Sequence, residues 1–514
     1  MKSALLKRQA AIVAIVLFFA ILAAAASILL INGDKLVKVA VVGGIFFPLV
    51  LYLSGNPRLF FLVGLVLAAP LGLSINFKTL IHIGGAPSYS VDLADFFLFP
   101  LVIFQIRDVI IGHYRDWSFP SINYWWLGLI CLGLLNIAMG PLRHLPGFEV
   151  MRMVKCMILF VVVVNECKRI KQINYVVIAL AAGMCLQVAV GVAQFLLKRS
   201  LGLQALGEAS SEATKGANLG VYLTENAVYR IGALMGHPNL LSAYLALLLP
   251  IFIALFFCHY KRWVKGVLAL VIAGGLMALV FTLSRSGWIS FAAAFLMLIT
   301  LSAFDGHIRS KYRAIRVFMI AGTVVAGLAV SGPIIQRITK SDAGAVDFRF
   351  EFMVVAVKMV EAKPLLGFGL NTFVYHMAPF TKYQNAAGLQ KVFGEHWPAV
   401  HNTYLLVWSE QGTLGLVFFI GFLIHVFKIY RQNRRYRVNE FTHALNLGIM
   451  CGFVAILIDG MASFFIRVPA PGRVFWIVMA LLVAINIWNR RNYRARLIAA
   501  QRAAIREGLD DKQK

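Results

Sequence analysis

Two histidines and an asparagine stand just before a long apolar run and are the first candidates for chemistry. The stretch "EHWPAVHNTYLLVWSEQG" (395–412) contains His396, His401 and Asn402. A neutral imidazole beside a hydroxyl group can act as a general base. His401 is therefore the candidate catalytic residue, and His396 and Asn402 are supporting candidates.

The expected start of a helix bears on the protonation state of His401. Pro398 suits the first position of a helix, which predicts that His401 lies in the first helical turn. The positive end of the helix would keep the imidazole neutral, while Glu395 would raise its basicity. The sequence does not decide which of these two opposing effects on the pKa of His401 is larger. A single histidine at such a junction is more often structural, and this applies more strongly to His396 and His237.

Three arginines are predicted at one edge of the membrane. Arg230 lies in "YRIGALMGHPNLLSAY", with Asn239 nearby, Arg285 lies in "FTLSRSGWISF", and Arg349 begins a helical pattern. Guanidinium groups bind phosphate oxygens in a bidentate manner and could neutralise a pyrophosphate leaving group. The alternative is that they reach toward solvent or pair with a carboxylate such as Glu225 or Glu351.

Motifs for metal-dependent or nucleotide-dependent chemistry are missing from the sequence. It contains no HExxH, Walker loop or GxSxG, and the carboxylates expected beside the arginines are scattered. Divalent-metal sites usually need clustered carboxylates. We therefore expect a site without a metal or other cofactor.

The composition determines which kind of fold must position these residues. Of the 514 residues, 60% are hydrophobic and 14% are charged. Apolar runs of about 17 to 25 residues recur along the chain, and each can span a bilayer. These runs predict an all-α polytopic membrane protein of about 12–14 transmembrane helices. The basic, apolar N-terminus is interpreted as an uncleaved first span rather than a signal peptide. The six cysteines lack a CxxC pattern and are interpreted as core residues.

The positive charges suggest an orientation for the predicted spans. The net charge of +27 could indicate nucleic acid, but cytoplasmic anchoring explains it in a membrane protein. We expect no nucleic-acid partner, both termini in the cytoplasm, and the arginines and His401 on the outer face. The predicted spans are centred near residues 21, 45, 66, 102, 131, 159, 186, 249, 274, 295, 325, 415, 455 and 482. The segments predicted to be cytoplasmic are "CKRIK" (167–171), "YKRWVK" (260–265), "HIRSKYRAIR" (307–316), "KIYRQNRRYR" (428–437) and the tail.

The chain divides by hydropathy into four predicted regions. These are N-terminal transmembrane helices (1–200), a catalytic region (201–430), C-terminal transmembrane helices (431–488) and a basic cytoplasmic tail (489–514). The catalytic region contains a long outer loop (333–402) with a helical pattern over 347–362, which is expected to lie on the membrane surface. The tail is expected to be a helix near anionic lipid or a solvated helix.

Four motifs occur in a familiar order. They are "RIGALMGHPNLLSAYLALLLP" (230–250), "LSRSGWISF" (283–291), "RFEFMVVAVKMVEAKPLLGFGLNTF" (349–373) and "HNTYLLVWSEQGTLGLV" (401–417). Together they resemble the O-antigen ligase and Wzy polymerase superfamily over roughly residues 225–425. Ligases of this family usually have about twelve spans, fewer than the fourteen counted here, which leaves ligase and polymerase both open.

The resemblance implies a metal-independent, inverting glycosyltransferase of the GT-C type in the bacterial inner membrane. The donor would be a glycan on undecaprenyl pyrophosphate. The acceptor would be lipid A–core in a ligase, or a lipid-linked glycan in a polymerase. By resemblance, His401 is the catalytic histidine and Arg285 and Arg349 bind the pyrophosphate, with Arg230 as a third.

A lipid-glycan flippase or other transporter is the alternative from another functional class. Transporters place charged residues near the membrane midplane, often within inverted repeats. The candidates are Asp108, Glu410 and Asp459, but they fall near predicted span ends, and the sequence shows no repeat.

Overall fold

Membrane-length helices dominate the computed structural model, which describes residues 54–79, 85–112, 117–209, 229–304, 343–382 and 399–510. Within these residues, seven helices are long and apolar enough to cross a membrane. They are α7 (Ile170–Leu197), α9 (Pro238–Phe256), α10 (Arg262–Phe281), α11 (Arg285–Phe304), α17 (Thr403–Arg435), α18 (Glu440–Asp459) and α19 (Pro469–Asp510). The predicted all-α polytopic membrane fold is confirmed.

The other elements are shorter or more polar. The helices are α3 (Pro57–Ala68), α4 (Leu93–Ile110), α5 (Asn123–Met139), α6 (His144–Glu166), α14 (Ala343–Ala362) and α15 (Phe373–His376), with 3-10 turns η1 (Gln204–Leu206), η2 (Ala233–Met235), η3 (Ala378–Phe380) and η4 (Phe465–Arg467). Strands β1 (Ser74–Phe77) and β2 (Tyr89–Asp92) form an antiparallel pair that pairs Ser74 with Asp92 and Phe77 with Tyr89. The sequence interpretation did not include this pair. Every predicted span centre within the described residues lies in a helix, while the centres near 21, 45 and 325 lie outside them.

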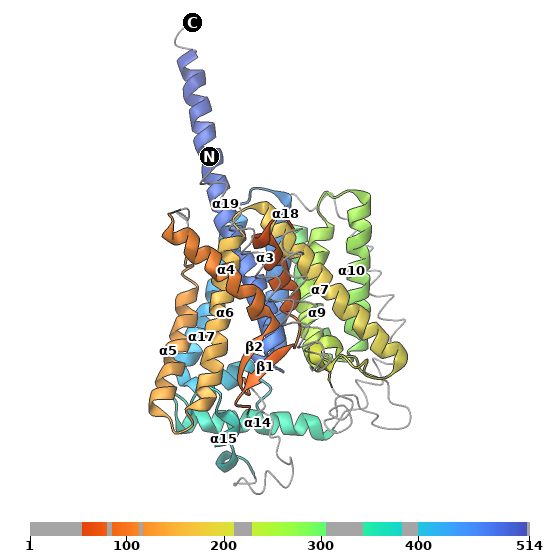
Figure 1. Cartoon of the computed structure of the whole chain (residues 1–514), viewed down its shortest axis with the longest axis vertical. Coiled ribbons are helices and arrows are strands. Elements are labelled where there is room, and N and C mark those ends of the chain that lie inside the picture. The colour runs from red at the N-terminus through yellow and green to blue at the C-terminus, as the bar shows by residue number, and fades with distance from the viewer. Residues whose placement is uncertain are drawn as a thin grey trace, which may run out of the picture. The chain divides into compact units, whose positions relative to one another are not determined.

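The helices from α4 onward alternate between two ends of the bundle. Figure 1 shows α14 lying across one end, here called the α14 end, and the C-terminal part of α19 extending beyond the opposite end. The basic segments 167–171, 260–265 and 428–437 lie at helix termini of the opposite end. The sequence predicted that these three segments share a side, and the described helices agree; segment 307–316 lies outside the described residues.

Close backbone contact between α9 and α18 forms part of the bundle core. Gly448 and Gly452 are four residues apart and face α9. A β-carbon at Gly452 would lie 2.1 Å from the carbonyl oxygen of Leu247, and one at Gly448 would lie 2.5 Å from the α-carbon of Ile251. Small residues at this spacing let two membrane helices approach closely. This packing fixes the neighbouring ends of α9 and α18, which both carry residues of the candidate site.

Helix α17 is broken at Gly412, whose φ of 65° and ψ of −168° are non-helical. The residues that follow α14 fill the break: Thr413 donates its backbone N–H to the carbonyl of Pro364 at 2.7 Å, and Leu414 donates to Leu365 at 3.3 Å. Backbone groups freed inside a membrane protein need such partners. The break therefore attaches the end of α14 to the middle of α17.

A buried ionic network attaches the segment 343–382, here called the crossing segment, to the bundle. Glu410 accepts from the backbone N–H groups of Asn371 at 2.8 Å and Phe373 at 3.1 Å. Arg467 donates to Glu410 at 2.6 Å and to Glu149 at 3.0 Å. All three charged side chains are buried. Glu410, considered above as a transport residue, is thus engaged in holding the crossing segment.

Candidate active site

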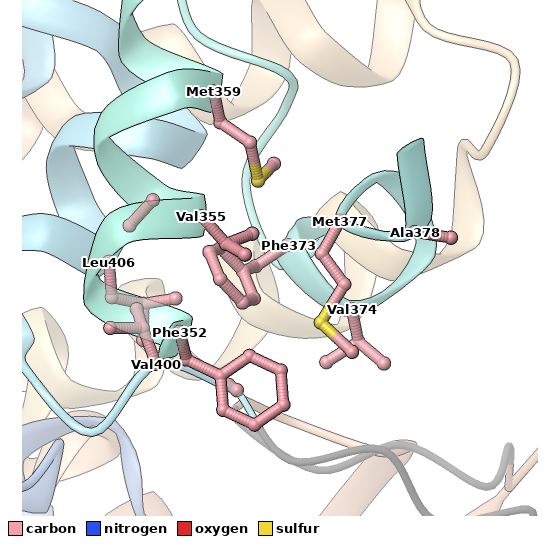
Figure 2. Close-up of a cluster of buried hydrophobic side chains, with 11 residues drawn as sticks. Phe352, Val355, Met359, Phe373, Val374, Met377, Ala378, Val400 and Leu406 are labelled. Carbon is pink, nitrogen blue, oxygen red and sulfur yellow. The ribbon is translucent and has the colours of Figure 1, made fainter. Parts of the chain in front are cut away.

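A hydrophobic cluster positions the two segments that carry Arg349 and His401. Figure 2 shows Phe352 of α14, Phe373 of α15, and Val400 and Leu406 near the start of α17 gathered in one group of buried side chains. Arg349 lies one helical turn before Phe352, and His401 directly follows Val400. Packing of the apolar neighbours therefore fixes both polar residues at the α14 end.

The start of α17 differs from the sequence prediction. The helix begins at Thr403, and His401 precedes it rather than lying in its first turn. Asn402 is the N-cap because its side-chain oxygen accepts from the backbone N–H groups of Tyr404 and Leu405, each at 3.0 Å. The Asn402 amide also donates to the carbonyl of Met461 at 3.2 Å. The cap thus fixes His401 against the segment that follows α18.

Burial and a neighbouring arginine make His401 a weak base. Loss of solvent, followed by the positive charge of Arg349, lowers the pKa of His401 to about 4, although a hydrogen bond to the backbone of Ala399 opposes the shift. The ring lies 5.3 Å from that of Phe464. The sequence left the direction of this shift open, and burial together with Arg349 accounts for the lowered pKa of His401. One ring nitrogen donates to Ala399, so the other retains a lone pair that can accept a proton.

His237 is a second neutral histidine in the same cluster. It is the N-cap of α9, where its Nδ1 accepts from the backbone N–H of Asn239 at 3.0 Å. The neutral ring therefore carries its proton on Nε2. Burial, then the charges of Arg230, His401 and Arg349, lower the pKa of His237 to about 3. Arg230, His401 and Arg349 therefore all lie within electrostatic reach of His237.

Arg230 is held by two helix ends. Its Nε donates to the carbonyl of Thr282, which follows α10, and its Nη2 donates to the side-chain oxygen of Asn239 in α9, both at 3.0 Å. The guanidinium is part-buried. Asn239 thus orients Arg230, which places an oriented positive charge beside His237.

Asp459 joins this cluster from the end of α18. Its carboxylate is 1% exposed and accepts from the hydroxyl of Ser463. Ser286 and Arg349 are further neighbours that act on the same carboxyl group. The sequence interpretation considered Asp459 only as a transport residue. The sequence did contain one indication of a role in the site. Asp459 lies at the end of a predicted span, on the same predicted side of the membrane as His401.

Arg285 begins α11 directly after a turn of three residues, which confirms the predicted tight hairpin between two spans. Its side chain is half-buried. Among the described residues, no hydrogen bond or ion pair links it to the two histidines or to the other arginines. Its neighbour Ser286 reaches Asp459, so the structure places the backbone of Arg285 beside the cluster.

Only some of the remaining candidates from the sequence lie within the described residues. His396, Glu395, Pro398 and Glu225 lie outside the described residues. Glu351, proposed as a possible partner of Arg349, pairs instead with Lys382 at 3.0 Å. Arg349 lies in the second turn of α14 rather than at its start, because the helix begins at Ala343. Within the part of the chain that was described, no group of three or more His, Cys, Asp or Glu side chains has a metal-binding arrangement.

The fold and the cluster define a polytopic helical membrane protein with arginines and neutral histidines gathered at one end of its bundle. Residues 270–420 match the family model described as O-antigen ligase. This region includes Arg285, Arg349 and His401. The match confirms the resemblance of the motifs in this region to the O-antigen ligase and Wzy polymerase superfamily. No match was found among curated proteins.

Proposed function

We propose that this protein is a membrane glycosyltransferase of the O-antigen ligase type. It transfers a glycan from undecaprenyl pyrophosphate to a sugar hydroxyl of lipid A–core on the periplasmic face of the bacterial inner membrane. The observation that carries the proposal is the gathering of Arg230, Arg349, His237 and His401 at one end of the bundle. Two permanent cations beside two neutral imidazoles suit a pyrophosphate next to a reacting hydroxyl.

The arginines supply donor binding in this proposal. Arg230 and Arg349 bind pyrophosphate oxygens, and Arg285 joins them when the donor is present. The Nε2–H of His237 is a further donor to a phosphate oxygen, because its Nδ1 is engaged in capping α9. Asp459 lies near Arg349 and is engaged by Ser463, so it forms part of the wall beside the bound donor.

His401 supplies the proton acceptor. Its free ring nitrogen takes the proton from the acceptor hydroxyl as the hydroxyl oxygen attacks the anomeric carbon. The bond between that carbon and the pyrophosphate oxygen breaks, and the lipid pyrophosphate leaves with the bonding electrons. This single displacement inverts the anomeric configuration and needs no nucleotide. Arginine side chains stabilise the negative charge that develops on the leaving group.

A Wzy-type polymerase is the second candidate, because the resemblance of the four motifs extends to both ligases and polymerases. It uses the same donor chemistry, with a second lipid-linked glycan as acceptor. Transport receives less support because Glu410 is bound within a structural network and Asp459 lies in the cluster.

Reconstitution with defined substrates tests the proposal. The purified protein in liposomes receives a lipid-pyrophosphate glycan together with either lipid A–core or a second lipid-linked glycan, in the presence of a chelator. We expect glycan transfer to lipid A–core. Extension of the lipid-linked glycan alone identifies a polymerase instead. Activity that returns only when a divalent ion is added contradicts the metal-independent mechanism.

The variant His401→Ala tests the site itself. It should lose transfer by about two to four orders of magnitude, the usual contribution of a general base. His376→Ala is the matched control, because His376 lies in the crossing segment against Phe368, away from the cluster. Equal activity of His401→Ala and the wild-type protein would refute the assigned role, provided that both variants insert and elute normally.

A further inference from the structure

A polar cavity lies at the end of the bundle opposite α14 and has no part in the proposed transfer. Its volume is about 480 Å³, and it is lined by the ends of α9, α11 and α18, by the α17–α18 linker and by Arg496 of α19. This volume is within the usual range of small-molecule sites, about 300–1,000 Å³. We call it the basal cavity.

The polar lining of the basal cavity carries more positive than negative groups. Arg437 and Arg496 supply the positive charge, and His443, which is only 7% exposed, adds a buried imidazole to the lining. Glu440 is the only carboxylate among the described lining residues, and it is paired with His259 at 2.6 Å. The first turn of α18 also borders the cavity, and a helix N-terminus favours an anion. These features together suit a phosphate group.

The wall toward the bundle interior is apolar. It is formed by Ala254, Phe257, Ala444 and Leu447. Helix α9 ends at Phe256 and α18 begins at Glu440, so the cavity lies where apolar helices end. A ligand that joins a phosphate to an apolar part can therefore contact both the basic lining and the apolar wall. A free phosphate can contact only the basic lining. Basic pockets at the cytoplasmic ends of membrane helices commonly bind anionic lipid head groups.

The arginine of the linker that lines the cavity differs from its neighbours. Arg437 is half-buried, while Arg434 and Arg435 on the preceding helical turn are exposed. Anchoring of a cytoplasmic face requires only exposed cations. The partial burial of Arg437 beside a buried histidine indicates a formed site rather than a diffuse basic surface.

We propose that the basal cavity binds the phosphate head group of an anionic phospholipid, with its glycerol and first acyl carbons against Phe257 and Leu447. The proposal does not depend on the transferase assignment.

Binding to the full-length protein in a neutral detergent tests this inference. Short-chain phosphatidylglycerol, phosphatidylcholine and inorganic phosphate are titrated separately, and binding is followed by the thermal stability of the protein. We expect saturable stabilisation by phosphatidylglycerol only. Equal stabilisation by phosphatidylcholine overturns the proposal, because charge is then irrelevant. Equal affinity for inorganic phosphate also overturns it, since the apolar wall then contributes nothing.

Paired variants locate the site. Arg437→Gln combined with Arg496→Gln should weaken phosphatidylglycerol binding by about tenfold, as expected for loss of charge-assisted contacts. Arg434→Gln combined with Arg494→Gln removes two cations from the same segments that do not line the cavity, and it should leave the affinity nearly unchanged. Equal weakening by both pairs would show attraction to the general basic surface and would contradict a specific cavity.

Discussion

At the scale of single residues, the site combines permanent positive charges with histidines that resist protonation. Arg349 lowers the pKa values of both His237 and His401, in addition to the effect of burial. The same guanidinium that would bind the donor therefore also keeps His401 able to accept a proton. Sequence reasoning identified both residues but could not reveal this coupling, because 51 intervening positions separate them in the chain.

The pH dependence of transfer follows from the neutral state of His401. A histidine with a pKa of about 4 stays a free base down to that pH, so kcat/KM should fall only below about pH 4. Bound pyrophosphate is negative and favours the imidazolium, which raises the pKa in the complex. The acid limb of kcat should therefore lie at a higher pH than that of kcat/KM. Initial-rate profiles across pH would check the order of the two limbs, and the reverse order would contradict it.

Two substitutions of Arg349 separate its two effects. Arg349→Lys keeps the positive charge and should leave the acid limb of kcat/KM in place, while loss of the planar fork raises KM for the donor. Arg349→Gln removes the charge, and the acid limb should move to higher pH because the pKa of His401 rises. If both variants show the same pH profile, Arg349 does not control the protonation of His401.

At the scale of elements, hydropathy predicted the helices well and their ends less well. A membrane helix satisfies its own backbone groups, so an apolar run alone is sufficient to predict it. The start of α17 was misplaced because Pro398 and Asn402 are both helix-start signals, and the side-chain cap of Asn402 determines the start that is formed. The break at Gly412 was not predicted, since it depends on contact with residues 364 and 365.

The break in α17 predicts an unusual sensitivity to a single methyl group. At Gly412 a β-carbon would lie 2.2 Å from the carbonyl oxygen of Leu365, and the positive φ is itself unfavourable for alanine. Gly412→Ala should destabilise the protein by roughly 1–3 kcal/mol or more and reduce transfer. Gly266→Ala in α10 is the control, because a β-carbon there meets nothing within 4 Å. Thermal unfolding in detergent compares them, and equal stability of the two variants would show that α17 tolerates a side chain at the break.

At the scale of the whole bundle, the candidate site depends on contacts between segments far apart in sequence. Arg230, Arg349 and His401 come from three separate segments, and all three lie within electrostatic reach of His237 at the start of α9. The sequence predicted their common side, but not their convergence, because side chains that meet through long-range packing leave no local pattern. The Arg467 network was also missed, since its two glutamates lie in different helices.

Removal of Arg467 tests how strongly this network holds the crossing segment. Arg467→Met leaves Glu410 buried without its ion-pair partner, and breaking a buried pair costs about 3–5 kcal/mol. Arg107→Met removes an arginine that is 60% exposed from its pair with Asp108, so solvent already screens the interaction and a smaller loss is expected. Unfolding in detergent measures both. If Arg467→Met lowers the free energy of unfolding no more than Arg107→Met does, the network does not support the fold.

The interruption of α17 also affects how the protein can change over evolution. In a continuous helix, each inserted residue rotates everything beyond it by about 100°. Here the nine residues 403–411 form a separate outer piece, whose orientation is set by Asn402, Glu410 and the chain after α14. An insertion within 413–435 rotates and shifts only the part of α17 that follows the break, and it leaves His401 in place. The transmembrane part of α17 can therefore lengthen or shorten to suit bilayers of different thickness while the orientation of His401 is retained.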